Sequence, residues 1–489
     1  MKKETIQILS LSFLAVLYNY FFWYEEIGLN LFIFNMLIVG IMLFGIFPES
    51  RKNRIVQLTT LFTILASSMV LVHNSVISKL GYLVSFGVMV GFIHQNQLKT
   101  LFGAGMQYGL NVLFTLPQSF QFVGKQVEKM IGENRYSKFI FKNLPLMVIP
   151  LIVFFIFFVL FASSNPVLRD LLDALGANLS YYFGNFFAKI SMGRILFILL
   201  GIYFLFSVLF DWNPVKNINK AVIRNDFIEH SEQVSANKIN NEFKTALMLI
   251  VSVNMLLAVV NIIDINFLWL NFAYSEAGNL SKLVHEGTYS LIFSILLSMA
   301  ILLYFFRKDL NFYPKIKILR FLAFTWIIQN IILAISVCIR NSYYIGFYGL
   351  THKRIGVYLF LLLTVIGLLT LLLKIKDLKS FSYLFKVNSW AWYLVLLGLT
   401  LVNWDAQIVR YNLSNQPIEK IDWDYLLSLS DRTIPAFYEH QDKFLNNSSV
   451  TARLEGKTAY FLKEQQNYSW LSWNCADYQV LKCVNSSSK

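Results

Sequence analysis

The run IGVYLFLLLTVIGLLTLLL, residues 355–373, decides the class of this protein. It contains no charged residue, and as a helix it would be about 28 Å long at about 1.5 Å per residue. That length nearly matches the hydrocarbon core of a bilayer, which is about 30 Å thick. Lys353 and Arg354 precede the run, and Lys374 and Lys376 follow it. The stretch therefore predicts a transmembrane helix.

Similar apolar runs recur along most of the chain. Hydrophobic residues make up 56% of the sequence and charged residues only 14%, which is outside the soluble globular range. In lipid, a helix satisfies all its backbone hydrogen bonds within one segment. The sequence therefore predicts an all-α polytopic membrane bundle of about eleven helices (10–12). The expected spans are residues 5–23, 31–47, 55–73, 78–94, 144–162, 193–210, 246–268, 290–306, 321–339, 355–373 and 389–404.

Basic residues alternate between the connecting segments. The N-terminus and every second connection hold 25 of the 42 Lys and Arg residues against 11 acidic ones, which equals the whole net charge of +14. Lys and Arg are retained on the cytoplasmic side during insertion. The pattern predicts an inner-membrane protein with a cytoplasmic N-terminus, and cytoplasmic loops that contact anionic lipid. Because topology accounts for the charge, nucleic acid is not an expected partner.

Two segments do not fit the pattern of simple spans. Residues 98–117 are interrupted by glycines, Gln107 and Asn111, and as a span they would move a basic stretch outside. We interpret them as an interfacial helix. Residues 1–403 are then the transmembrane domain and residues 404–489 an extracytoplasmic helical tail. In that tail Asp422 is placed to cap one short helix, and a second begins at Asp431 with Pro435 in its first turn.

One acidic residue, Asp264, lies within a predicted span. Asn254 and Asn261 share a helical face with it to within about 80°, and Gln329 and Asn330 lie in the run 321–339. A carboxylate in the membrane indicates a functional site for a proton or cation by default. Polar side chains also join helices to one another, so structural adhesion is the alternative.

Other candidate sites lie in segments predicted to be external. Cys475 and Cys483 lie in the tail, where an oxidising compartment permits a disulfide. On one continuous helix, however, their Cα atoms would be about 12 Å apart, beyond the roughly 7 Å limit for a bridge. Disulfide and separate thiols both remain open. Glu25 and Glu26 form either a solvated turn or the paired carboxylates of a lipid-linked transferase.

The sequence contains no motif for a metal, a cofactor or a catalytic centre. The six histidines have no metal-ligand spacing, and no Walker, dinucleotide or nucleophile-elbow motif occurs. We therefore expect no cofactor and no catalytic residues, and the sequence favours a protein that is not an enzyme.

Two stretches carry a resemblance to a known family. They are YGLTHKRIGVYLFLLLTVIGLL, residues 348–369, and LVNWDAQIVRYNLSNQPIEKIDWDYLLSLSDRTIPAFYE, residues 401–439. Together they resemble the bacterial multi-pass membrane family known as domain of unknown function 4173. The resemblance implies a polytopic bacterial membrane protein and no catalytic residue.

The same two stretches predict an external cluster, formed by Tyr348, Thr351, Arg354, Asp405, Arg410 and Asn412. Opposite charge and shared sidedness predict that Arg354 pairs with Asp405 and docks the tail; a ligand site is the alternative. For function, the sequence favours a non-enzymatic sensor, assembly factor or envelope scaffold. The alternative is a transporter or lipid-linked transferase that uses the polar site near Asp264.

Overall fold

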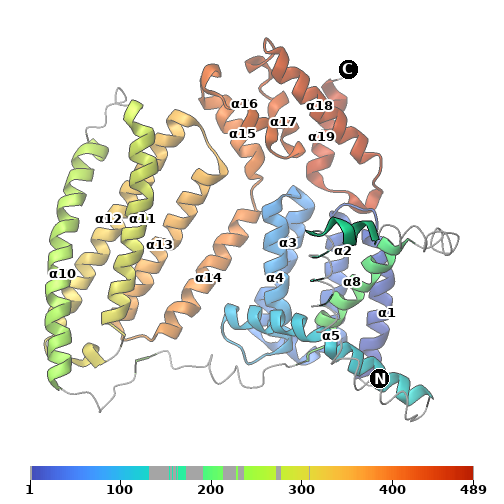
Figure 1. The fold of residues 1–489 in the computed structure, drawn as a ribbon, viewed down its shortest axis with the longest axis horizontal. Coiled ribbons are helices and arrows are strands. Elements are labelled where there is room, and N and C mark those ends of the chain that lie inside the picture. Colours follow the sequence, from blue (N-terminus) through green and yellow to red (C-terminus); the bar gives the residue numbers. More distant parts are fainter. Residues whose placement is uncertain are drawn as a thin grey trace. The chain divides into compact units, whose positions relative to one another are not determined.

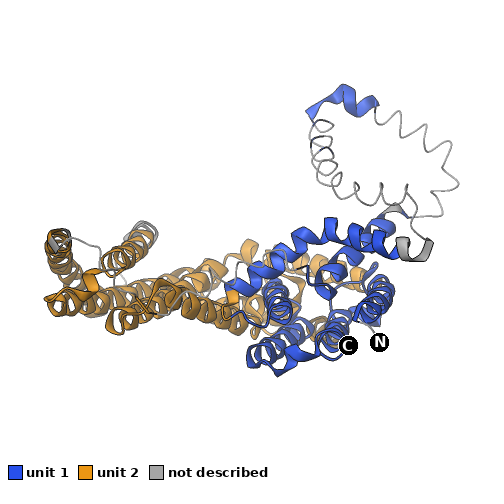
Figure 2. Cartoon of the chain, turned by 90° about the horizontal axis from the view of Figure 1, so that it is seen from below, with its two compact units in different colours: residues 1–98, 102–219, 468–474 blue, residues 99–101, 220–467, 475–489 orange. Residues whose placement is uncertain are grey.

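The computed structural model describes residues 3–131, 154, 157, 161, 164–171, 191–212, 227–228, 236–270, 277–307 and 309–487. Within these residues the secondary structure is helical (Figure 1), apart from one isolated antiparallel bridge between Phe227 and Lys379. The chain forms two compact units (Figure 2). Unit 1 contains residues 1–98, 102–219 and 468–474; unit 2 contains residues 99–101, 220–467 and 475–489.

Unit 1 is built mainly from apolar helices. Most of them pack against the next helix in the sequence, and α1 also packs against the distant α8. Helix α1 packs against α2 and α8, α2 against α3, and α3 against α4. The elements are α1 (Lys3–Phe22), α2 (Leu29–Gly40), the π-helix η1 (Ile41–Ile46), the 3-10 helix η2 (Pro48–Lys52), α3 (Arg54–His73), α4 (Val76–His94), α5 (Leu101–Ile131), α8 (Met192–Leu209) and the 3-10 helix η9 (Trp470–Ser472).

Polar residues fix the ends of these helices. Asn53 caps α3 by accepting from the N–H of Ile55, and Ser75 caps α4 by accepting from the N–H of Ser78. Between the two helices Asn74 adopts the left-handed conformation, with φ of 45°, which asparagine tolerates better than most residues. This single residue turns the chain back, so that α3 and α4 form a hairpin.

Unit 2 contains a group of long helices around α12, which packs against α10, α11 and α13; α13 also packs against α14. These elements are α10 (Ala236–Asp264), the π-helix η3 (Ile265–Leu270), α11 (Ala277–Phe305), the 3-10 helix η5 (Asp309–Phe312), α12 (Ile316–Tyr348), α13 (His352–Lys376) and α14 (Phe381–Thr400). Their shared core includes Trp326 and Leu368, both fully buried. Lys374 is also buried and donates to the carbonyl of Phe306 at 2.6 Å.

The rest of unit 2 is a cluster of short helices with its own core, which includes Ile408, Leu426, Phe437 and Val480. The elements are α15 (Trp404–Asn415), η6 (Ile418–Lys420), α16 (Trp423–Ser428), η7 (Asp431–Thr433), α17 (Ile434–Tyr438), η8 (Gln441–Lys443), α18 (Ser448–Gln465) and α19 (Cys475–Ser487).

The predicted starts of two short tail helices, at Asp422 and Asp431, are confirmed. The carboxylate of Asp422 accepts from the N–H of Tyr425 at 3.0 Å and caps α16. The next helical segment begins at Asp431, and Pro435 lies in the first turn of α17. In both cases the local sequence was sufficient, because a cap is decided by residues a few positions apart.

The predicted all-α class agrees with the described residues, but the count of eleven spans is not confirmed. Seven described helices are long and apolar enough to cross a membrane, or eight if the bent pair α14 and α15 is one span. The predicted spans 193–210 and 290–306 correspond to shorter apolar helices, Gly193–Leu209 and Tyr289–Phe305. Nearly all of the predicted span 144–162 lies outside the described residues.

Two predicted boundaries compare differently with the structure. Residues 101–117 of the predicted segment 98–117 lie in α5, which continues to Ile131 and is not among the candidate spans; its interfacial position stays a prediction. The predicted division at 403/404 does not coincide with the compact units, because unit 2 includes α10–α14 as well as most of the tail. The division at 403/404 concerns the point at which the chain leaves the membrane. The compact units do not test that point, so it stays a prediction.

Candidate functional site: polar contacts within unit 2

The predicted intramembrane polar residues lie along the contact between α10 and α12. The side chain of Gln329 donates to Asn254 at 3.0 Å. Asn254 also donates to the carbonyl of Leu322, and Asn261 donates to the carbonyl of Gln329 at 3.1 Å. Asn330 bonds to the carbonyl of Trp326 in its own helix. The amides therefore connect two helices, as polar groups do in membrane bundles.

Asp264 makes a buried ion pair that the sequence reasoning missed. The Nη2 of Arg340 donates to Oδ1 of Asp264 at 2.6 Å, and the two side chains are only 11% and 8% exposed. Asp264 is the last residue of α10, and Arg340 lies eight residues before the end of α12. Because each charge neutralises the other, α10 and α12 are joined by a neutral pair at this level.

Arg340 follows the apolar run 321–339 directly, so a search for basic residues at the same end of the predicted spans would have included it among several candidates. Within the described part of the chain, neither the second carboxylate oxygen, Oδ2 of Asp264, nor Nε of Arg340 has a hydrogen-bond partner. The pair is thus held by a single strong contact.

Within the predicted external cluster, Asn412 is the central connection. Its side chain accepts from the N–H of Leu350 at 2.7 Å and donates to the carbonyl of the same residue at 2.8 Å. Gly349 adopts a φ of 82°, and a Cβ there would lie 2.1 Å from Oδ1 of Asn412. Glycine is therefore required both by the backbone conformation and by the approach of Asn412. This contact fastens α15 to the turn between α12 and α13.

The predicted pairing of Arg354 with Asp405 is wrong in its partner. Arg354 donates to the carbonyls of Tyr348, at 2.8 Å, and of Gly349, and its guanidinium lies 4.4 Å from the ring centroid of Tyr344. These carbonyls belong to the end of α12 and the residue after it, where backbone acceptors are left unpaired and a cation is favoured. The basic side chain is therefore used within its own turn.

Asp405 instead contacts His352, whose Nε2 lies 2.8 Å from its Oδ1. The other ring nitrogen, Nδ1, lies 3.1 Å from the hydroxyl of Tyr425, which also accepts from the backbone N–H of His352. Thr351 precedes this group as the N-cap of α13, without a side-chain cap bond. The result is an aspartate–histidine–tyrosine chain that joins α13, α15 and α16.

Electrostatics in this chain favour the ionised carboxylate. Burial would raise the pKa of Asp405, but hydrogen bonds from His352 and Ser430 outweigh it and hold the pKa below its ordinary value of 3.8. Burial raises the pKa of Tyr425. Sequence reasoning missed this group, because its three members are separated by up to 73 residues.

Arg410 lies apart from the other members of the predicted cluster. It pairs with Glu439 through two hydrogen bonds, of 2.7 and 2.8 Å, on the exposed surface of the tail. The hydrogen bond from Arg410 holds the pKa of Glu439 below its ordinary value of 4.5. Of the six predicted residues, Tyr348, Arg354 and Asn412 thus meet at the turn around Gly349, whereas Asp405 and Arg410 have partners elsewhere in unit 2.

The two tail cysteines lie on one continuous helix. Cys475 is the first residue of α19, and Cys483 lies eight positions further along it. At about 1.5 Å per residue their Cα atoms are about 12 Å apart, so the structure contains no bridge between them. The disulfide needed a bend that α19 does not have.

Glu25 and Glu26, in unit 1, are not simply a solvated turn. Glu25 accepts hydrogen bonds from the N–H of Ser469, at 3.1 Å, and from the hydroxyl of Ser472. The N–H of Glu26 donates to that hydroxyl at 2.8 Å, and the N–H of Leu29 donates to the carbonyl of Trp473. Through these contacts the loop after α1 holds residues 468–474 of the tail sequence within unit 1.

The candidate spans and the internally paired polar groups define a polytopic helical membrane protein. The family model described as Domain of unknown function (DUF4153) matches residues 11–440, and the chain belongs to this family. The expectation of a family without assigned function is confirmed, although the number expected from the two stretches, 4173, differs. Neither the curated proteins nor the solved structures compared with the chain gave a match.

Proposed function

We propose that the protein is a non-enzymatic scaffold of the bacterial envelope. In this proposal the N-terminus is cytoplasmic, the helical bundle is an anchor in the inner membrane, and residues 404–489 present an external surface. The alternation of basic segments supports this orientation. Labelling Cys475 and Cys483 in intact cells with a membrane-impermeant maleimide tests it. An external tail is labelled before lysis, and a tail labelled only after lysis would reverse the orientation.

The observation that carries the scaffold role is the pair of Asp264 and Arg340. A carboxylate that binds and releases protons or cations must exchange its partner during each cycle. Here the carboxylate is bound at 2.6 Å by a guanidinium and is 8% exposed. A buried charge with a fixed opposite charge holds the two helices in one arrangement.

The tail supports the same role by its construction. It has its own apolar core and additional ion pairs, such as that of Arg432 with Asp477. Lys457 donates to the carbonyl of Leu427 at 2.9 Å and lies 3.5 Å from Asp431. These contacts keep short helices in one arrangement, which a surface that binds other envelope components requires.

A transporter is the second candidate, and one observation favours it. No described residue forms a hydrogen bond with Oδ2 of Asp264, and the helix continues from Asp264 as the π-helix η3. Local π-helical turns are frequent at functional sites. In this alternative the carboxylate leaves Arg340 during transport.

The test compares Asp264→Asn, Arg340→Gln and the double variant in cells, with Lys353→Gln as a matched exposed control. Abundance is measured by immunoblot, and function by rescue of the deletion strain under envelope stress. A scaffold predicts that each single variant loses abundance, because one buried charge is left alone, and that the double variant recovers both abundance and rescue. A double variant that is abundant but fails to rescue would overturn the scaffold role and favour the transporter.

A further inference from the structure

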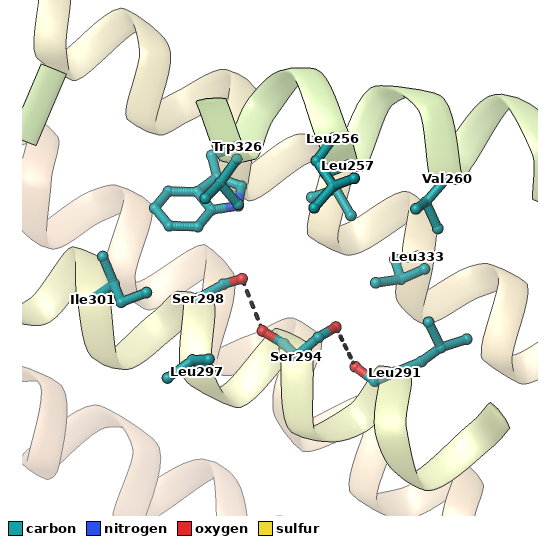
Figure 3. A pocket seen from close by; sticks show the side chains of 11 residues that line it. Leu256, Leu257, Val260, Leu291, Ser294, Leu297, Ser298, Ile301, Trp326 and Leu333 are labelled. Atoms are coloured by element: carbon teal, nitrogen blue, oxygen red, sulfur yellow. Dashed lines mark hydrogen bonds between the residues drawn. The ribbon is translucent and has the colours of Figure 1, made fainter. Parts of the chain in front are cut away.

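An apolar pocket of about 280 Å³ lies between α10, α11 and α12 in unit 2. Trp326, Leu333 and Ser298 are nearly or fully buried at its base, whereas Leu256 and Leu297 are 65% and 50% exposed. The pocket is therefore open along the sides of the helices rather than enclosed in the core. All three contributing helices contain apolar segments (Figure 3).

The pocket contains one unused hydrogen-bond donor. Trp326 is fully buried, and its Nε1 has no hydrogen-bond partner among the residues that the structure describes. By contrast, the hydroxyls of Ser294 and Ser298 donate to the carbonyls of Leu291 and Ser294 in their own helix. A buried N–H without an acceptor costs about 1–3 kcal/mol. A ligand that brings an acceptor to this position would remove that cost.

The donor lies toward one end of the pocket. Figure 3 shows Trp326 and Ile301 toward one end, and Val260, Leu291 and Leu333 toward the other. Trp326 and Leu333 are seven residues apart on α12, which is about 10 Å along the helix. The pocket thus has a polar group near one end and an apolar channel beyond it.

The end with the donor is also the basic end of these helices. Contacts of Arg307 with Glu242, at 3.7 Å, and of Tyr313 with Asn240, at 2.9 Å, bring the start of α10, the end of α11 and the start of α12 together. The basic residues at this end are Lys244, Arg307, Lys315, Lys317 and Arg320.

The spacing between charge and donor has a chemical meaning. Trp326 is six residues from Arg320, about 9 Å along α12. A glycerophospholipid has the same order of groups: a charged phosphate, then ester carbonyls, then hydrocarbon chains. Long basic side chains extend toward the headgroup region, so the carbonyl level falls near the indole.

We propose that this pocket binds one acyl chain of an anionic glycerophospholipid, whose ester carbonyl accepts a hydrogen bond from Nε1 of Trp326. The volume suits this ligand, because pockets for whole drug-sized molecules span about 300–1,000 Å³. The pocket therefore has room for the part of one chain next to its ester group, while the headgroup stays outside near the basic residues. This binding goes beyond the scaffold role and does not depend on it.

The decisive experiment compares two lipids that differ only in the carbonyl. Full-length protein is equilibrated with diester phosphatidylglycerol or with its diether analogue, and retained lipid is counted by native mass spectrometry. A neutral hydrogen bond of about 1 kcal/mol corresponds to about a five-fold preference for the diester. Equal retention of the two lipids by the wild-type protein would overturn the carbonyl contact without any variant.

Variants then locate the site. Trp326→Phe keeps a ring but removes the donor, so the preference falls to about one, whereas Trp392→Phe on the exposed face of α14 leaves it unchanged. Ser298→Phe fills the pocket and removes the retained lipid. Its control, Ser252→Phe, adds the same ring at an exposed position of α10. Equal retention by the two serine variants would place the lipid elsewhere.

The headgroup is tested with diester phosphatidylcholine. Preferential retention of phosphatidylglycerol supports the role of the basic end, and equal retention of the two headgroups would overturn it. The wild-type protein could instead retain an isoprenoid quinone that Ser298→Phe no longer retains. That result would overturn the assignment of the pocket to a phospholipid.

Discussion

The ion pair of Arg432 and Asp477 offers a sharp test of how the tail is held together. Nε of Arg432 lies 2.7 Å from Oδ1 of Asp477, and the two side chains are 14% and 6% exposed. The pair connects η7 to the first turn of α19. Arg432→Gln removes the cation and leaves a carboxylate that is almost completely buried.

The expected size of the effect follows from burial. Removing one partner of a buried ion pair costs about 3–5 kcal/mol, because the remaining charge has no compensation. That corresponds to a change of about 100-fold to several thousand-fold in the equilibrium constant for unfolding, since about 1.4 kcal/mol is ten-fold. Gln465 also donates to this carboxylate, at 3.5 Å, but a neutral amide cannot replace the charge of Arg432.

The matched control is Arg410→Gln. Arg410 also pairs with a carboxylate in the tail, at 2.7 Å, but both side chains are more than 40% exposed. An exposed pair contributes about 0.2–1 kcal/mol. Urea-dependent pulse proteolysis of the full-length protein in nanodiscs measures the unfolding free energy of both variants. Equal effects of the two substitutions, or a loss below about 1 kcal/mol for Arg432→Gln, would refute the reasoning from burial.

Three further predictions follow from contacts in unit 2. Asn412→Ala leaves the N–H and carbonyl of Leu350 without their side-chain partner, so we expect a loss of about 2 kcal/mol or more in the same proteolysis assay; an unchanged midpoint would contradict it. The pKa values of Asp405 and Glu439 are held below their ordinary values of 3.8 and 4.5, so their contribution is complete above those values and is lost as the pH falls below them. Hydrogen exchange in the tail should accelerate over that acidic range, less so in a variant with both carboxylates replaced by amides. The two thiols of α19 should react equally with maleimide in denatured protein with and without reductant, and a difference would show a bridge.

Much of the fold could be predicted because its signals are local. The run 355–373 predicts α13 by its length and its lack of charge, and Asp422 predicts the start of α16. Each depends on residues within a few helical turns. The number of spans was less secure, since length and hydropathy place 193–210 and 290–306 close to the limit for crossing a bilayer.

The candidate site shows where local reasoning stops. Asp264 was recognised as unusual because a carboxylate in an apolar run is costly wherever the helix lies. Its partner Arg340 could not be chosen from several basic residues without knowing how α10 and α12 pack. The same holds for Asp405. The sequence predicted Arg354 as its partner, whereas in the structure Asp405 contacts His352.

The sequence by itself thus determined the helical class, most helix positions and the asymmetry of charge, because hydrophobic length, capping and the positions of Lys and Arg are properties of the chain. Tertiary structure alone decided which charges meet: Asp264 with Arg340, and Asp405 with His352. It also decided that the indole of Trp326 lines a pocket, without a hydrogen-bond acceptor for its N–H among the described residues. The physical reason is that an ion pair or a pocket depends on distances of a few ångströms between helices, and those distances are set by packing.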